Sequence, residues 1–185
     1  MNTKLVCAFA LTSALAAGSA IAADGGTIRF DGLVTDGTCV ISGGAGTDGG
    51  TGNIAVPLDS VAVTSLDTVG AVAGKKAFNI IVTGEDGGEC VSGRNANFSF
   101  ESSSLRVDAE TGNLINALMG ETNAQLQLLD RDTNTAIDLS QPNTKTVAFD
   151  ASNRAVLPFA AQYFAKDVGT PGRLSTSVVY SVTYN

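Results

Sequence analysis

The sequence has no histidine and no tryptophan among its 185 residues. The absence of imidazole excludes histidine metal sites and every mechanism that pairs a serine or cysteine nucleophile with a histidine base. Basic residues number 11 against 18 acidic ones, which gives a formal net charge of −7. An acidic chain without a basic cluster is a poor partner for nucleic acid or an anionic membrane. We therefore expect a protein that is not an enzyme, with no catalytic residue, no metal site, no cofactor and no nucleic-acid partner.

The first 22 residues have the order of a Sec signal peptide. Lys4 supplies one positive charge, an apolar run follows, and small residues lead to Ala20-Ile21-Ala22. The apolar run is too short and too interrupted by polar residues to span a bilayer well. We expect export and removal of residues 1–22, with cleavage after Ala23 as the alternative. The remaining 163 residues suffice for one domain with its own core.

Cysteine is scarce, and one of the three cysteines, Cys7, lies in the signal peptide. Cys39 and Cys90 remain, and an even pair in an exported chain indicates one disulfide. A disulfide that closes a loop of this length stabilises the folded chain by about 4 kcal/mol in the chain-entropy treatment. Two buried free thiols are the alternative reading.

Short alternating segments separated by turn residues dominate the rest of the chain, which is typical of an antiparallel sandwich or barrel. One short helix is expected at residues 113–119. The segments that read as strands are residues 28–34, 53–57, 76–83, 97–101, 125–128, 136–139, 146–149, 156–165 and the C-terminal run from Gly172.

Two motifs imitate calcium sites. The glycine-rich stretch 43–52 begins like a calcium-binding β-helix repeat, but that repeat needs tandem copies and a large apolar residue where Gly50 stands. Asp130-x-Asp132-x-Asn134 begins like an EF-hand loop but lacks the glycine and the glutamate that complete one. We interpret the first as a flexible surface loop and the second as a hairpin turn.

The two ends of the mature chain carry the strictest alternation. At the C-terminus a period of two over a dozen residues predicts a long strand with one buried face. That strand is either an interior strand of a complete sandwich or an unguarded edge that recruits another chain. At the N-terminus, residues 28–34 either pair within their own domain or leave it and pair with a neighbour. Periodicity alone does not decide between these alternatives.

An ordered set of segments resembles the chaperone–usher pilin family, in particular the major subunit of type 1 fimbriae. The C-terminal strand has a tyrosine at the penultimate position, and Gly172 is the fourteenth residue from the end, as in the family's C-terminal motif. The other matching stretches are residues 26–34, 77–80, 127–131, 157–165 and 170–172.

This resemblance implies an all-β fold, an incomplete immunoglobulin-like β-sandwich that lacks its last strand and is completed in trans by a donor strand. Residues 1–22 would be the signal peptide, 23–35 the donor extension and 36–185 the pilin domain. The donor residues that fill a neighbour's groove would be Ile28, Phe30, Gly32 and Val34. The residues of the acceptor groove and C-terminal strand would be Gly172, Leu174, Val178, Tyr180, Val182 and Tyr184.

The resemblance also implies partners and a location. The partners would be neighbouring pilin subunits, a periplasmic chaperone that anchors the Asn185 carboxylate, and an outer-membrane usher. The chain would be exported through the periplasm to a cell-surface fimbrium, as a structural subunit that polymerises by donor-strand exchange. The alternatives are a minor adaptor or terminator pilin and a self-contained secreted carbohydrate-binding β-sandwich.

Overall fold

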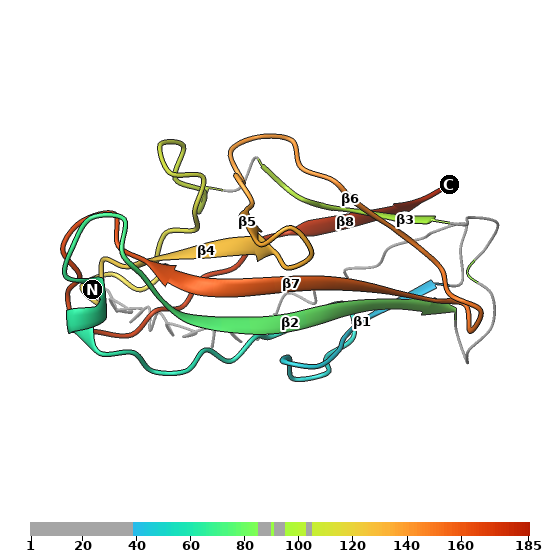
Figure 1. Ribbon diagram of the computed structural model, residues 1–185, viewed down its shortest axis with the longest axis horizontal. Helices are drawn as coiled ribbons and strands as arrows, with labels where there is room; N and C mark the ends of the chain where they lie inside the picture. The colour runs from blue at the N-terminus through green and yellow to red at the C-terminus, as the bar shows by residue number, and fades with distance from the viewer. Residues whose placement is uncertain (1–38, 85–89, 91–94, 103–104) are drawn as a thin grey trace, which may run out of the picture. The chain divides into compact units, whose positions relative to one another are not determined.

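The computed structural model describes residues 39–84, 90, 95–102 and 105–185, which all belong to one compact unit, Thr35–Asn185. Within this unit the strands form two antiparallel sheets (Figure 1). The all-β fold predicted from the short alternating segments and the sandwich implied by the resemblance are therefore confirmed. The predicted signal peptide, residues 1–22, and the predicted donor segment, residues 28–34, lie outside the described residues.

The larger sheet has five strands in the order β1-β2-β7-β4-β5. Its centre consists of two long antiparallel strands, β2 and β7, which run side by side in Figure 1. The strands of this sheet are β1 (Cys39–Gly43), β2 (Val72–Gly84), β4 (Gln125–Asp130), β5 (Thr135–Ala136) and β7 (Arg154–Phe164).

The smaller sheet has three strands in the order β6-β3-β8, so β8 lies at its edge. The strands are β3 (Asn95–Phe100), β6 (Lys145–Ala148) and β8 (Tyr180–Tyr184). A single turn of 3-10 helix, η1 (Val63–Leu66), precedes β2. Side chains in β3 alternate strictly between buried and half-buried positions, as expected for a strand with one face on a core.

Aromatic rings join the two sheets. The Phe98 ring of β3 lies 5.3 Å, centroid to centroid, from the Phe159 ring of β7, and Phe98 also packs edge-on against Phe100 at 4.9 Å. Aromatic pairs at such separations stabilise a core beyond the area that they bury. The buried set around them is Phe78, Ile80, Val82, Cys90, Ala96, Leu114, Leu128, Leu139, Ala155, Leu157 and Ala161.

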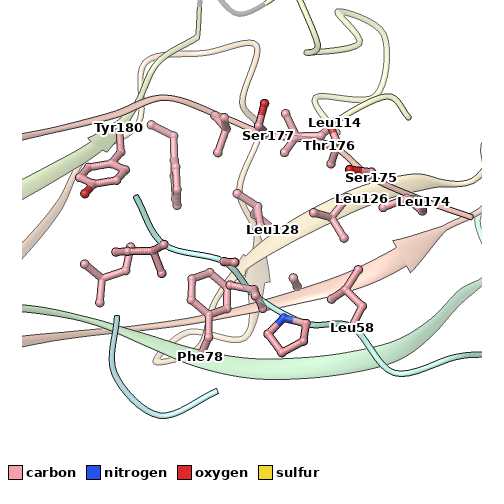
Figure 2. Close-up of a pocket in the computed structure, with 18 of the residues that line it drawn as sticks. Leu58, Phe78, Leu114, Leu126, Leu128, Leu174, Ser175, Thr176, Ser177 and Tyr180 are labelled. Atoms are coloured by element: carbon pink, nitrogen blue, oxygen red, sulfur yellow. The ribbon is translucent and has the colours of Figure 1, made fainter. Parts of the chain in front are cut away.

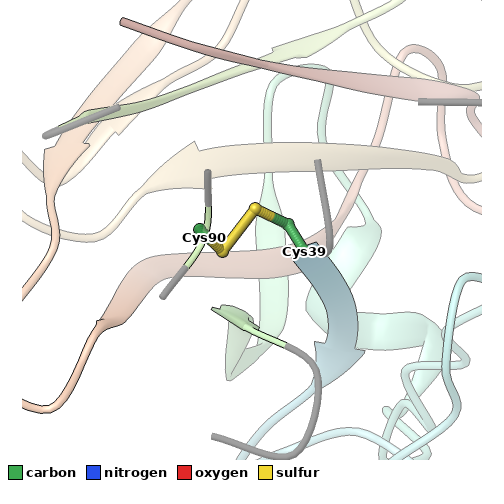
Figure 3. The surroundings of a disulfide bond; sticks show 2 residues. All are labelled: Cys39 and Cys90. Carbon is green, nitrogen blue, oxygen red and sulfur yellow. A yellow bond between two sulfur atoms is a disulfide. The ribbon is translucent and has the colours of Figure 1, made fainter. Parts of the chain in front are cut away.

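Cys39, at the start of β1, is bonded to Cys90, and their Cα atoms lie 4.9 Å apart (Figure 3). The predicted disulfide is thus present. Cys90 is buried in the core, so the bond ties the 51-residue interval to the centre of the domain.

The helix predicted for residues 113–119 is wrong. Leu114 is fully buried and forms isolated bridges to Val107 and Leu126, so this stretch is an extended loop that crosses the end of β4. The apolar residues that resembled one helical face are placed by these tertiary contacts instead. The hairpin predicted at residues 130–134 is confirmed, since it connects β4 to β5 and places Asn134 at a φ of 55°.

The glycine-rich stretch 43–52 is a surface loop, as predicted, and it continues the pairing of β1 with β2. The Gly44 N–H donates to the Asn79 carbonyl at 2.8 Å, and the Asn79 N–H donates to the Ala45 carbonyl at 2.9 Å. Gly46 adopts a φ of 85°, and a Cβ there would lie 2.1 Å from the Ala77 carbonyl oxygen. Glycine is therefore required at this position so that the loop can approach β2 closely.

A polar network fixes the loop before residue 113 to β4 and to the end of β7. The Lys166 ammonium contacts the Asp108 carboxylate at 2.8 Å, and the Gln125 amide donates to the same oxygen at 2.6 Å. Lys166 also contacts Glu110 at 2.7 Å. The bond from Lys166, aided by the Glu110 N–H and the Gln125 amide, lowers the pKa of Asp108 from 3.8 to about 2.

The lowered pKa of Asp108 predicts in which direction the free energy of unfolding changes with pH. Because the folded pKa of Asp108 lies below its ordinary value, the carboxylate stabilises the fold above about pH 4 and loses this effect as the pH falls toward 2. We expect Asp108→Asn to lower the free energy of unfolding at pH 7 by about 1–2 kcal/mol, allowing for the partial exposure of Lys166. It should also flatten the stability profile between pH 4 and 2 in denaturant titrations. Asp67→Asn, at an exposed position, is the control, and equal profiles for the two variants would contradict the assignment.

Candidate functional site

Within the described part of the chain, one edge of β8 is open along its whole length. The odd-numbered residues bond to β3 and its flanks, from Glu101, whose N–H donates to the Val179 carbonyl at 2.9 Å, to the Asn95–Asn185 pair at 3.0 and 3.2 Å. In an antiparallel ladder bonded and non-bonded positions alternate, so the even-numbered N–H and C=O groups face away from β3. Among the described residues, no strand pairs with that side of β8.

The chain before β8 continues the same alternation without forming a ladder. Leu174, Thr176 and Val178 are half-buried, whereas the residues between them are exposed. The predicted strand from Gly172 is therefore wrong in its first half, since β8 begins only at Tyr180. The segment is extended, but within the described part of the chain no strand lies beside its open edge. We call residues 174–180 the C-terminal rim.

A second extended segment faces the C-terminal rim. Its side chains alternate in the same way, with Ile54, Val56 and Leu58 half-buried and packed against the core. On its outer side Ala55 bonds to Asp48, whose backbone N–H donates to the Ala55 carbonyl at 2.9 Å. The backbone groups of Ile54 and Val56 have no hydrogen-bond partner among the described residues. We call residues 52–58 the N-terminal rim.

An apolar groove of about 590 Å³ lies between the two rims (Figure 2). The labelled side chains in the figure show Leu174 and Tyr180 toward its opposite ends and Leu128 on its floor. The floor comes from both sheets and from the loop at residue 114, and consists of Phe78, Ile80, Phe100, Leu114, Leu126, Leu128, Ala161 and Tyr163. Two rims with open backbone edges over an apolar floor leave a space suited to one further strand.

Tyr180 connects the rims at one end of the groove. Its ring stacks on Phe98 at 5.1 Å, and its hydroxyl donates to the Gly52 carbonyl at 2.5 Å. Burial raises the pKa of the Tyr180 phenol, so the hydroxyl keeps its proton at neutral pH. The glycine-rich stretch therefore supplies one contact at the end of the groove.

The structure separates the predicted acceptor residues into two groups. Leu174, Val178 and Tyr180 line the groove. Val182 and Tyr184 pack against the core from β8 beyond the groove, and Gly172 is exposed. The predicted donor residues Ile28, Phe30, Gly32 and Val34 lie outside the described part of the chain.

Gly172 has a separate structural role. Its φ is 147°, and a Cβ on it would lie 2.4 Å from the Thr122 backbone nitrogen. Glycine at this position lets the chain pass close to residues 121–122 before it enters the C-terminal rim.

The sequence reasoning missed the whole N-terminal rim as part of the site. Residues 53–57 were expected to be a strand, but nothing assigned them to the groove. The signal was present, because the alternation of Ile54, Val56 and Leu58 matches that of the C-terminal rim. The floor residues could not be found in this way, since they come from five separate segments of the chain.

Other kinds of site find no support in the described part of the chain. No group of three or more acidic or cysteine side chains there is placed to hold a metal ion. No helix among the described residues has the length and apolar character needed to cross a membrane.

The fold and the groove together define a class: a two-sheet antiparallel β-sandwich in which no described strand fills the position beside β8. The chain is 39% identical over 175 residues to the major fimbrial subunit SMF-1 of Stenotrophomonas maltophilia, covering 90% of this chain and 96% of that protein. It is 36% identical over 176 residues to the F17 fimbrial protein of Escherichia coli, with 92% and 93% covered. The chain belongs to the family of fimbrial subunits.

The resemblance to type 1 fimbrial subunits is also confirmed, because the chain is 27% identical over 181 residues to the type-1 fimbrial protein, A chain, of Escherichia coli, with 96% of this chain and 93% of that protein covered. The P pilus rod subunit PapA has the same fold, with a TM-score of 0.53 and 16% identity over 87% of this chain and all of that one. No family model matches the chain. The protein is a structural subunit of a fimbrium, which forms pili with other such subunits.

Proposed function

We propose that this subunit polymerises by strand donation, in which residues 28–34 of one copy enter the groove of the next. The observation that carries the proposal is the groove between two rims whose inner backbone edges have no partner among the residues that the structure describes. The N-terminal segment matches this groove in length. Residues 28–34 and the C-terminal rim 174–180 each have seven residues, roughly 20 Å at about 3.3 Å per residue.

The donor segment also matches the groove in side-chain pattern. Ile28, Phe30 and Val34 are apolar, and three such side chains contribute roughly 5–9 kcal/mol when buried. Each ladder bond to the open edge of a rim adds roughly 0.5–1.5 kcal/mol. Gly32 has no side chain, so at this position the donor backbone can approach the groove wall closely.

The proposed donor segment and the C-terminal rim of the groove lie at opposite ends of the mature sequence, and each copy has one donor and one groove. Repetition of a head-to-tail contact of this kind gives an open filament rather than a closed ring. This is consistent with a subunit of a fimbrial shaft. It also disfavours a self-contained secreted sandwich, because an unpaired edge at β8 would promote aggregation of such a protein.

Before polymerisation the groove requires a temporary occupant, because an unpaired edge over apolar surface promotes aggregation. We propose that a periplasmic chaperone supplies it and that an outer-membrane usher directs the exchange after export and removal of residues 1–22. Asn185 extends the ladder with β3 by one residue, and its side chain is exposed. Its carboxylate is then available to a basic anchor on the chaperone.

The test uses the full chain expressed with its cognate chaperone. We expect Gly32→Leu to abolish filaments in electron micrographs while the complex with the chaperone is still recovered, because only the donor is changed. Gly25→Leu, outside the four donor positions, is the matched control and should polymerise normally. Filaments of normal yield from Gly32→Leu would rule out this donor register. A stable soluble monomer without the chaperone would rule out the incomplete fold itself.

A further inference from the structure

The Asn116 side chain uses its whole hydrogen-bonding capacity. Its Nδ2 donates to the Arg173 carbonyl at 2.8 Å and to the Thr122 carbonyl at 3.0 Å. Its Oδ1 accepts from the Ser175 N–H at 3.0 Å and from the Leu118 N–H at 3.1 Å. An amide offers two donors and two lone pairs, so no capacity is left over. Such a fully used side chain holds the segments that it joins in one arrangement.

Two of these four bonds end at the start of the C-terminal rim, one on Ser175 and one on Arg173, the residue just before the rim. The Arg173 carbonyl and the Ser175 N–H belong to odd-numbered residues, which β3 would bond if it extended this far. Among the residues that the structure places, the β3 side of the ladder ends at Glu101, opposite Val179. Beyond that point the Asn116 amide takes the place of a neighbouring strand.

Two further contacts support the same stretch from the loop beside Asn116. The Ala117 N–H donates to the Ser175 carbonyl at 2.7 Å, and the Thr176 hydroxyl donates to the Ile115 carbonyl at 2.8 Å. The outer edge of the rim is thus held near residues 173–176, while the inner edge stays open toward the groove. The rim is supported at both ends, by this loop and by β3.

We propose that Asn116 is a positioning residue for strand donation: it aligns the first half of the C-terminal rim so that Leu174 and Thr176 meet the incoming strand in register. The inference rests on the proposed function. Ladder bonds weaken steeply as their angle departs from linearity, so a misaligned rim pairs poorly. A rim that must be ordered during docking also loses affinity to the entropy of ordering, which a preformed rim avoids.

A second asparagine provides a matched control. The Asn123 Nδ2 donates to the Val168 carbonyl at 3.0 Å, and its Oδ1 accepts from the Thr170 N–H at 2.9 Å. Asn123 therefore also joins its loop to the chain leading to β8 through backbone groups. Asn123, Val168 and Thr170 do not line the groove. Asn116→Asp and Asn123→Asp each replace an Nδ2 donor by an oxygen, so they remove bonds of the same kind.

The experiment refolds the full chain with an excess of a fluorescent peptide of the sequence 23–35 and follows peptide release after addition of unlabelled peptide. We expect Asn116→Asp to release the peptide about 10- to 30-fold faster than the wild type, which corresponds to the loss of the two Nδ2 bonds, to the Arg173 and Thr122 carbonyls. Asn123→Asp should stay within about threefold of the wild type, although thermal unfolding of both variants shifts by similar amounts. Equal release rates for the two variants, or an unchanged rate for Asn116→Asp, would overturn the inference.

Two further comparisons keep the result interpretable. If Asn116→Asp does not fold, then Asn116→Ser, which keeps an acceptor, is compared with Asn123→Ser in the same assay. A peptide carrying Gly32→Leu tests the proposed function separately, since the wild-type chain should bind it far more weakly. If the wild-type chain binds the 23–35 peptide and its Gly32→Leu variant equally well, strand donation is wrong, and so is the proposed role of Asn116. If only the Asn116 comparison fails, strand donation stands without it.

Discussion

Replacing Ala161 by phenylalanine is expected to block polymerisation while leaving the domain folded. Ala161 lies in β7, opposite Lys76 of β2 and Leu128 of β4, and it is 1% exposed on the floor of the groove. A phenylalanine ring at this position would project into the space that a donor side chain needs. Loss of one donor contact and the strain of overpacking together weaken strand binding by about 3–4 kcal/mol, on the order of 100- to 1000-fold.

The measurement is filament yield by electron microscopy and light scattering, together with recovery of the chaperone complex of the full chain. Ala136→Phe is the matched control, because Ala136 is exposed on β5 outside the groove. Ala161→Val should give an intermediate loss, since it fills less of the groove. Wild-type filament yield from Ala161→Phe would show that the donor does not occupy this part of the groove.

Removing the disulfide is expected to have the largest effect on stability. Cys39→Ala together with Cys90→Ala opens a loop of 51 residues, and the chain-entropy treatment gives a loss of about 4 kcal/mol in the free energy of unfolding. Small domains that lose a native disulfide often fail to fold at 37 °C, so the yield of folded subunit should fall as well.

Guanidinium titration of the full chain in complex with the donor peptide measures this loss. Reduction of the wild-type protein should move its unfolding midpoint to that of the double variant, whereas the same reductant should leave the double variant unchanged. A difference below about 1 kcal/mol between oxidised wild type and double variant would mean that the bond contributes little beyond the packing of its two residues.

Most of the fold was predictable from alternation, because a strand with one buried face needs an apolar residue at every second position. This pattern correctly located the strands around Phe78, Phe98 and Phe159. It failed at residues 113–119, where the apolar residues Leu114, Ile115 and Leu118 have spacings that fit both a helix and a loop. Leu114 is buried by bridges to distant residues, and such contacts leave no periodic signal in their own segment.

The sequence by itself determined that the chain consists mainly of short strands and that the C-terminal residues alternate to the end, and it indicated a bond between Cys39 and Cys90. These features depend on side-chain type and local spacing. Only the tertiary structure decided that β8 is an edge strand and that the segment before it has an open side toward residues 52–58. The physical reason is that the pairing of a strand depends on which other segments lie beside it. The same alternation of side chains suits an interior strand and an unpaired one. The role of Asn116 was hidden for the same reason, because its partners lie 57 and 59 residues further along the chain.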